Sequence, residues 1–411
     1  MTMSQKNSIS NSQKWAMYVI AASFYFYDFI LKLIPSIMME NIIERLSIST
    51  QEFGYVELSF YAIYTPMQLL CGPLLDEYGQ RKILPSVIAV CLIGSIISAL
   101  TTNYTFYIIA RLLIGMGSAF AFVTVLKIAS EWLPKKIYPL LAGLTTTFGM
   151  LGGIVSESIA PLFNQYDQIY FYSIIVVIGS LLLIGSICVV KDREDHEQNG
   201  LDLGLILNDI KQIMKKKQVW IAGTVGMCMF SPIQLFIPWA ISFFAHDLGT
   251  SELVGGNIAS LLFWGACVFA PILGWIAGKI EKKRNLLFLG NVCSLAGMTM
   301  ILYSAQTNIW TSMLLMFITG IGVAIQPLVF VYSSREVDLH LTATAVAITN
   351  FIINLSSLIQ PYIGNQLIEV SKQVYSLESW RNALSIIPIM LLVNCLLIYM
   401  LKEIKYDKEY D

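Results

Sequence analysis

An acidic and a basic residue lie four positions apart in the apolar stretch FYFYDFILKLIP, residues 24–35. In a helix, Asp28 and Lys32 would therefore share one face. Two interpretations follow from this spacing. The two side chains can neutralise each other as an internal ion pair. Alternatively, Asp28 carries a coupling proton or binds a substrate amine, and Lys32 is its partner or the receptor for a substrate carboxylate.

Four more ionisable residues interrupt apolar stretches: Glu57, Arg111, Lys127 and Glu157. If these stretches cross a membrane, each charge costs about 2.5–3.5 kcal/mol on insertion scales, which makes the residues functional candidates. We expect Glu57, near the end of its stretch, to reach water. Arg111 could pair with Glu57 or Glu157, and Glu157 with Lys32 or Arg111. Lys127 is expected to face a water-filled cavity and to bind an anion or act in gating.

The second half of the chain carries amides where the first half carries charges. Gln234 lies in one apolar stretch, and Asn350 and Asn354 lie four residues apart in another. They are candidates for hydrogen bonds to a substrate, but amides also join neighbouring helices. Tyr25 and Tyr61 are candidates to line a cavity, although aromatic residues in such stretches also mark interfaces and packing.

Groups of both signs together with neutral amides favour a zwitterionic solute, such as an amino acid or a small peptide. A small organic anion that uses only Lys32 and Lys127 also fits, and a neutral sugar fits less well. No histidine falls deep in an apolar stretch, so proton coupling would run through carboxylates. The seven cysteines are dispersed with no CxxC pair, so we expect no disulfide framework, no metal site and no cofactor.

The elements that position these residues are expected to be membrane-spanning helices. Of the 411 residues, 56% are hydrophobic and 13% are charged, whereas soluble domains carry about 25% charged residues. A search for about 20 mostly apolar residues predicts twelve spans: 15–39, 53–75, 83–101, 106–132, 138–163, 169–190, 218–245, 254–277, 285–305, 310–334, 343–369 and 381–401. The net charge of −1 gives no reason to expect nucleic acid.

A charged segment divides these spans into two sets of six. We expect an N-terminal bundle over 1–190, a linker over 191–217 and a C-terminal bundle over 218–411. In the linker, apolar residues recur at helical spacing from Leu201 to Met214, which predicts a short amphipathic helix along the membrane face. Of the 26 Lys and Arg residues, only Arg45, Lys372 and Arg381 fall on the loops of one side. Both termini are therefore expected on the other, cytoplasmic side.

The two halves repeat each other in sequence. GPLLDEYGQRKIL (72–84) follows span two, and GWIAGKIEKKRNLL (274–287) follows span eight, at the equivalent place. LIGMGSAFAF in span four likewise matches ITGIGVAIQP in span ten. Internal duplication of this kind is typical of secondary transporters.

With these motifs the chain resembles the major facilitator superfamily along nearly its whole length. The turn after span two carries the family's Gly, Asp, Gly and basic positions: Gly72, Asp76, Gly79, Arg81 and Lys82. Span four carries its Arg and Gly positions: Arg111, Gly115 and Gly117. The span-five motif associated with antiporters is partial, because GMLGG (149–153) lacks the proline.

The resemblance implies an all-α membrane protein with twelve transmembrane helices in two six-helix bundles that rock about a central site. It implies that Asp76 accepts hydrogen bonds from the N-terminus of span eleven, and that Arg81 reaches the acidic end of span four at Glu131. The turn (Gly72, Asp76, Gly79, Arg81, Lys82) and Glu131 would then form a cytoplasmic gate. An ordinary solvated turn is the alternative.

We therefore expect a secondary active transporter rather than an enzyme, because the chain has no catalytic motif and no nucleotide-binding loop. The predicted activity is proton-coupled symport of an amino acid or small peptide, by a monomer in a bacterial inner membrane. The alternatives are an organic-anion transporter, an uncoupled facilitator or a transporter-like sensor. The expected partners are a small-molecule substrate, protons and the lipid bilayer.

Overall fold

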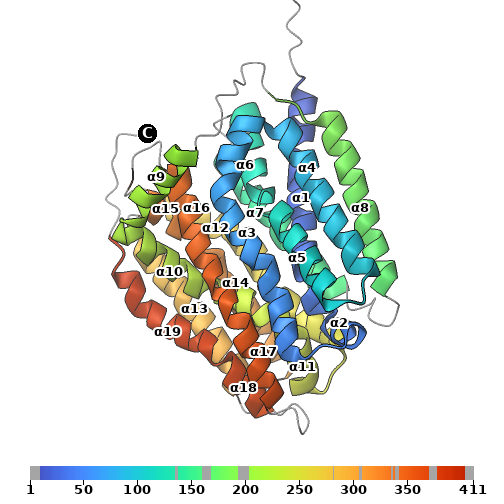
Figure 1. The fold of residues 1–411 in the computed structure, drawn as a ribbon. Helices are drawn as coiled ribbons and strands as arrows, with labels where there is room; N and C mark the ends of the chain where they lie inside the picture. The colour runs from blue at the N-terminus through green and yellow to red at the C-terminus, as the bar shows by residue number, and fades with distance from the viewer. Residues whose placement is uncertain are drawn as a thin grey trace, which may run out of the picture.

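The computed structural model describes residues 10–134, 138–159, 168–192, 203–280, 282–304, 308–334, 337, 342–369 and 377–402. Within these ranges every regular element is a helix. Figure 1 shows two halves side by side: the helices up to α8, in blue to green, and those from α9 onward, in yellow-green to red. The start of α1 and helix α9 lie at one end of the bundle, here called the termini side. Helices α2 and α18 lie on the opposite side.

Three helices of the first half begin at a polar cap residue: Ser10 for α1, Ser49 for α3 and Asn103 for α5. The helices of this half are α1 (Asn11–Ile37), α2 (Met39–Leu46), α3 (Thr50–Tyr78), α4 (Gln80–Leu100), α5 (Tyr104–Ser118), α6 (Ala121–Trp132), α7 (Tyr138–Ile159) and α8 (Gln168–Val189). Ser49 Oγ accepts a hydrogen bond from the Glu52 N–H (3.2 Å), and the Glu52 carboxylate accepts one from the Ser49 N–H (2.7 Å). This reciprocal cap satisfies two open N–H groups and fixes where α3 begins.

Two spans of the second half contain turns that are not α-helical. Its helices are α9 (Leu203–Met214), α10 (Lys217–Ser231), η3 (Pro232–Phe236), α11 (Ile237–Leu248), α12 (Glu252–Lys279), α13 (Lys283–Tyr303), α14 (Ile309–Ala324), α15 (Leu328–Ser334), α16 (Thr342–Asn354), η5 (Leu355–Ile359), α17 (Gln360–Glu369), α18 (Leu377–Leu384) and α19 (Ile386–Tyr399). The π-helix η3 joins α10 to α11, and the 3-10 helix η5 joins α16 to α17. These two turns pack against each other, so the α-helical geometry of spans seven and eleven is interrupted at the same depth of the bundle.

The helices are long and apolar enough for the predicted fold class. In the described residues, ten segments qualify as membrane spans by length and composition. Helices α3 and α7, with 29 and 22 residues, also exceed the about 20 residues that a bilayer requires. The chain is thus an all-α membrane protein with two sets of six transmembrane helices, as predicted. Large apolar side chains on its outer surface, such as Leu181 and Leu396, are exposed where lipid would cover them.

The sequence repeat corresponds to a structural repeat. Span four breaks into α5 and α6 at residues 119–120, and span ten breaks into α14 and α15 at residues 325–327, which are equivalent positions. Gly115 lies against the Phe60 carbonyl oxygen, and Gly320 lies against that of Leu262, so closely that neither site has room for a Cβ. Repeated glycines therefore permit the same close helix contact in each half.

The two halves meet along pairs of helices, with α3 on α16 and α17, α7 on α12, and α1 on α11. On the opposite side, Gly54 of α3 lies against the backbone of Pro361, where an added Cβ would approach Cα at 2.7 Å. Gly364 of α17 lies against the backbone carbonyl of Thr50. We call Gly54, Gly364, Thr50 and Pro361 the glycine contact. It brings α3 and α17 close together because neither glycine carries a side chain.

Candidate substrate and coupling site

Five ionisable side chains gather inside the first half. Helix α1 supplies Asp28 and Lys32, α3 supplies Glu57, α5 supplies Arg111 and α7 supplies Glu157, and none is more than 7% exposed. Lys32 and Arg111 each interact electrostatically with Asp28 and with Glu57. However, no side-chain nitrogen and oxygen of the five lie within 4.0 Å of each other. The ion pairs considered from the sequence are therefore absent, and these charges act on one another at longer range.

The Lys32 ammonium lies among aromatic rings instead of beside a carboxylate. Its Nζ is 4.8 Å from the ring centre of Tyr64, and 5.4–5.6 Å from those of Phe29, Tyr61 and Phe60. We call these four rings the aromatic box. In the described residues, Nζ has no hydrogen-bond or ion-pair partner. Cation–π attraction partly replaces the lost hydration of the ammonium, but all three of its N–H donors stay available to a ligand.

Arg111 holds α1 at its proline. Pro35 has no N–H, so it cannot donate to the Leu31 carbonyl one helical turn earlier. Arg111 Nη1 donates to that carbonyl oxygen at 3.0 Å, and Nη2 donates to the Lys32 carbonyl oxygen at 3.4 Å. The guanidinium also lies 4.9 Å from the Phe60 ring centre. Arg111 thus fixes the segment of α1 that carries Lys32.

Loss of Arg111 should therefore be less harmful when Pro35 is also replaced. In Pro35→Ala the new N–H can reach the Leu31 carbonyl, so Arg111→Leu no longer leaves that oxygen without a donor. We expect the two substitutions to be non-additive by about 0.5–3 kcal/mol. Thermal unfolding of the wild type, both single variants and the double variant measures this difference. Additive effects would show that Arg111 does not compensate for Pro35.

The carboxyl groups of the cluster lack hydrogen-bond donors. Asp28 Oδ1, Glu57 Oε1 and both carboxyl oxygens of Glu157 are buried without a partner in the described residues. The prediction that Glu57 reaches water is wrong, since its side chain is 3% exposed. Its helix continues for about two turns beyond it, to Thr50, and packs against α17 there.

The tyrosines predicted to line a cavity lie in two different settings. Tyr61 belongs to the aromatic box and is 5% exposed. Tyr25 is half-buried on α1, with its ring centre 5.3 Å from those of Phe29 and Phe122. Phe29 contacts both Tyr25 and Lys32, so it links the two tyrosines to one site.

Lys127 joins α6 to the end of α3. Its Nζ donates to the Leu75 carbonyl oxygen at 2.8 Å, and lies 3.7 Å from the Glu131 carboxylate one turn later on α6. The Leu75 carbonyl is in the last turn of α3, where a cation is favourable. Lys127 is thus placed at a helix junction on the termini side, and not in the buried charge cluster.

The turn between α3 and α4 binds the chain that follows α8. Gly79 has a φ of +75°, a conformation that favours glycine, and an added Cβ would meet the Asp192 carboxylate. Asp192 Oδ1 accepts a hydrogen bond from the Arg81 N–H at 2.9 Å, so it caps α4 in place of a side chain at Gly79. Gln80 Nε2 donates to the Lys191 carbonyl oxygen at 3.0 Å. The sequence did not indicate this cap.

The other predicted gate residues lie around this turn. No ion pair joins Arg81 to Glu131 in the described residues, where the Glu131 carboxylate lies beside Lys127, so the expected gate contact is not formed in this conformation. Lys82 is exposed, and an added Cβ at Gly72 would meet nothing within 4 Å. The side chain of Asp76 and the residues just before Thr342 lie outside the described part, as does their predicted hydrogen bond.

In the second half the amides form a connected hydrogen-bond network. Gln234 Nε2 donates to the Asn354 carbonyl oxygen (3.2 Å), and Gln234 Oε1 accepts from Ser356 Oγ (2.9 Å). Pro238 cannot donate to the Gln234 carbonyl one turn earlier, and Gln360 Nε2 donates to it. Gln360 Oε1 also accepts from Trp239 Nε1 at 2.7 Å. The network joins η3 and α11 to η5 and α17, which supports the role of amides as interhelical contacts.

Gln360→Leu should therefore destabilise the second half. The change leaves the Trp239 N–H and the Gln234 carbonyl without these partners, and both residues are fully buried. Each lost partner costs about 1–3 kcal/mol, which thermal unfolding would report as a lower Tm. Gln326→Leu is the matched control, because no hydrogen bond of that side chain is present in the described residues. Equal Tm values for the two variants would contradict the network.

Asn350 and Asn354, which share a helix, have separate roles. Asn354 Nδ2 donates to the Asn350 carbonyl oxygen at 2.8 Å, within α16. Asn350 Nδ2 donates across the halves to Gln68 Oε1 of α3. Asn350 thus connects the bundles, whereas Asn354 belongs to the amide network.

Sequence reasoning missed Gln68, Gln360 and Asp192. The first two are single polar residues in spans two and eleven, and their partners lie on other helices. One signal was present for Gln360: an amide directly before a proline in an apolar span, in LIQPYIG (358–364). Asp192 follows span six directly, but its contact with Gly79 depends on how α8 packs beside α4.

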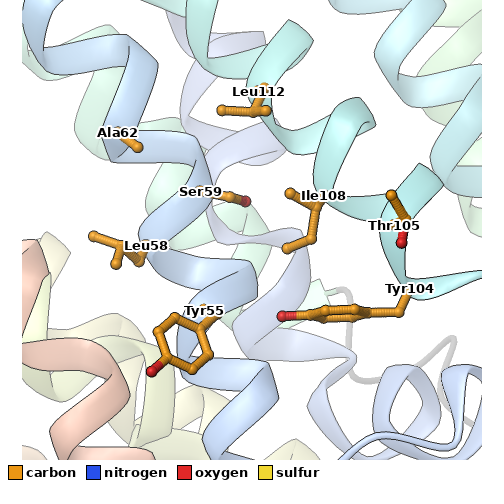
Figure 2. Close-up of a pocket in the computed structure, with 8 residues that line it drawn as sticks. All are labelled: Tyr55, Leu58, Ser59, Ala62, Tyr104, Thr105, Ile108 and Leu112. Atoms are coloured by element: carbon orange, nitrogen blue, oxygen red, sulfur yellow. The ribbon is translucent and has the colours of Figure 1, made fainter.

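A separate pocket of about 440 Å³ lies between α3 and α5. Figure 2 shows that its lining comes from these two helices: Tyr55, Leu58, Ser59, Ala62, Tyr104, Thr105, Ile108 and Leu112. The one hydroxyl from the middle of α3, on Ser59, already donates to the Val56 carbonyl oxygen (2.8 Å). The pocket carries no charged side chain, so it is not the polar site. No cluster of potential metal ligands occurs in the described residues.

Known proteins share the family and the fold of this chain. The sequence model described as "Major Facilitator Superfamily" matches residues 17–361 and 219–409. The "Probable sulfoacetate transporter SauU" of Cupriavidus necator is 21% identical over 65% of this chain, and the match spans 64% of that protein. The "Probable L-galactonate transporter" of Escherichia coli K12 is 24% identical over 80% of this chain and 77% of its own. The crystal structure of a D-xylose-proton symporter superposes with a TM-score of 0.77 over 96% of this chain and 99% of that one, at 15% identity.

Proposed function

Because the chain belongs to the Major Facilitator Superfamily and is a secondary transporter of small solutes, not an enzyme, we propose that it transports small organic anions. The observation that carries this proposal is the Lys32 ammonium, which is buried in the aromatic box without a hydrogen-bond or ion-pair partner in the described residues. A carboxylate or sulfonate can accept charge-assisted hydrogen bonds from its three N–H groups.

The relatives support an anionic solute. Sulfoacetate carries a sulfonate and a carboxylate, and L-galactonate carries a carboxylate and several hydroxyls. The substrates named for these two relatives are therefore anions. Tyr61 and Tyr64 next to Lys32 could offer hydroxyls to the polar body of such a solute.

We further propose that the solute moves by alternating access between the halves. The glycine contact would close the opposite side in this conformation, because it brings α3 and α17 together there. The turn at Gly79 and the junction at Lys127 lie on the termini side, which we take as the cytoplasmic side from the Lys and Arg bias. Separation of α3 and α17 would open the opposite side, and closure of the termini side would accompany it. We expect a monomer in a bacterial inner membrane.

A zwitterion is the second candidate solute. Asp28 lies one helical turn before Lys32 on α1, and its Oδ1 has no hydrogen-bond partner in the described residues. An amino acid or small peptide could place its ammonium at Asp28 and its carboxylate at Lys32. The same site then serves either class, and only the use of Asp28 distinguishes them.

The first test is a thermal-stability screen of the detergent-purified protein. The probes are L-galactonate, sulfoacetate, amino acids, dipeptides and glucose. A ligand that binds only the folded state raises Tm as its concentration exceeds Kd. We expect galactonate or sulfoacetate to raise Tm. Stabilisation by amino acids or dipeptides alone would replace the anion proposal with the zwitterion, and stabilisation by glucose alone would exclude both.

A further inference from the structure

Among the buried ionisable side chains of the cluster, Glu157 has the fewest groups that would stabilise its charged form. It is fully buried on α7, and neither carboxyl oxygen has a hydrogen-bond partner in the described residues. By contrast, only one carboxyl oxygen of Asp28 and one of Glu57 is both fully buried and without a partner. A carboxylate that lacks both donors and water is unstable relative to its neutral acid form.

The position of Glu157 makes its charge relevant to the contact between the halves. Gly153 lies one helical turn earlier on the same face of α7, with the Phe263 ring of α12 against it. Gly152 lies against the Phe26 carbonyl and the Phe29 side chain of α1. Glu157 therefore follows the place where α7 packs closely on both α1 and α12. A charge there would be surrounded by apolar packing.

The charged neighbours make ionisation of Glu157 still less favourable. In the described residues, Glu157 interacts electrostatically with Glu57, which is another carboxyl group and would repel a negative charge on Glu157. None of the charged residues on the helices packed against α7 forms an ion pair with Glu157 in the described residues: Lys14, Asp28, Lys32, Lys127, Glu131, Glu252 and Lys279. The two buried cations, Lys32 and Arg111, interact with Asp28 and Glu57. They compensate those carboxylates and leave Glu157 without a counter-charge.

We propose that Glu157 is held as the protonated acid in this conformation, and that its carboxyl group is the proton-binding site of the transporter. Asp28 and Glu57 are the ionised counter-charges of Lys32 and Arg111. When α7 and α12 separate, water reaches Glu157 and accepts its proton, which leaves a carboxylate. A proton from water on the other side must return before α7 and α12 can pack again. The release and the return of the proton rest on the proposed transport function. The protonation of Glu157 in this conformation does not.

Infrared spectroscopy of the full-length protein in a detergent without ester groups tests the protonation without any substrate. A protonated carboxylic acid in an apolar site gives a C=O stretching band that a carboxylate lacks. We expect this band at neutral pH in the wild type and in Asp28→Asn, and its loss in Glu157→Gln. A band that survives in Glu157→Gln or disappears in Asp28→Asn would overturn the assignment, as would its absence from the wild type.

Thermal unfolding provides a second readout that also checks folding. If Glu157 is neutral in the folded protein, the isosteric Glu157→Gln should match the wild-type Tm at about pH 4, where the side chain is protonated in the unfolded chain as well. As pH rises, only the wild type must take up a proton on folding, so its Tm should fall below that of Glu157→Gln. If Glu157 were an ionised partner of a cation, Glu157→Gln would lower Tm at neutral pH, which would refute the proposal. Failure of every anion to raise Tm in the ligand screen would refute the proposed solute, but would leave both readouts on Glu157 unchanged.

Discussion

Lys32→Met should reduce uptake of L-galactonate or sulfoacetate into proteoliposomes by about tenfold or more. Methionine keeps the length and apolar character of the lysine stem, so the aromatic box stays filled. The change removes the cation that would bind the solute anion, and hydrogen bonds to charged groups contribute about 1.5–3 kcal/mol each. A loss of 1.4 kcal/mol corresponds to about a tenfold change in affinity. Uptake of the labelled anion measures the effect directly.

Two control variants separate anion binding from general damage. Lys215→Met removes a cation from an exposed position after α9 and should leave uptake unchanged. Lys32→Arg keeps the charge and should retain part of the uptake. If Lys32→Met transports either anion at the wild-type rate, Lys32 is not the anion receptor. If Asp28→Asn abolishes amino-acid uptake in the same assay, the zwitterion becomes the preferred solute.

The second large effect is expected at the glycine contact. Gly54→Val places a side chain where even a Cβ would lie 2.7 Å from Pro361 Cα and 2.8 Å from the Gln360 carbonyl oxygen. These neighbours are backbone atoms, which cannot rotate away. Overpacking of this kind costs about 1–3 kcal/mol, and here it weakens only the conformation in which α3 and α17 touch. We expect uptake to fall by about tenfold, whereas ligand stabilisation in the thermal screen persists.

Gly274→Val is the matched control for Gly54→Val. Gly274 lies in α12, and an added Cβ would meet nothing within 4 Å. The same substitution should therefore leave uptake and Tm near the wild-type values. Equal losses at Gly54 and Gly274 would mean that valine harms these helices in general. Full uptake in Gly54→Val would show that the transport cycle does not require the glycine contact.

The sequence predicted the architecture because each span is a local property. About 20 apolar residues suffice to identify a membrane helix, and the motifs around Gly115 and Gly320 revealed the repeat. The breaks at residues 119–120 and 325–327 were not predicted. The first break occurs in uninterrupted apolar sequence, where composition does not indicate a change of helix geometry, whereas the second contains Pro327, whose missing N–H was a signal for a helix break.

The candidate site was less predictable because its partners come from different helices. Asp28 and Lys32 share a helix face as expected, but Phe60 and Tyr64 of α3 determine where the ammonium lies. Spacing along one helix could not indicate this. Similarly, Glu57 was expected near water from its position along the chain, and α17 buries that end of α3. Glu131 carried the right charge for Arg81, but Lys127 is closer on the same helix.

The broken helices in spans four and ten have a consequence for the order of events in transport. Each break separates a short termini-side segment, α6 or α15, from the longer helix behind it. Such a segment can bend inward without moving its whole bundle. The protein could then enclose its solute from both sides before the halves rotate. We expect this occluded state to be a distinct intermediate of transport. The bending of α6 and α15 at the two breaks would precede the larger rocking motion of the halves.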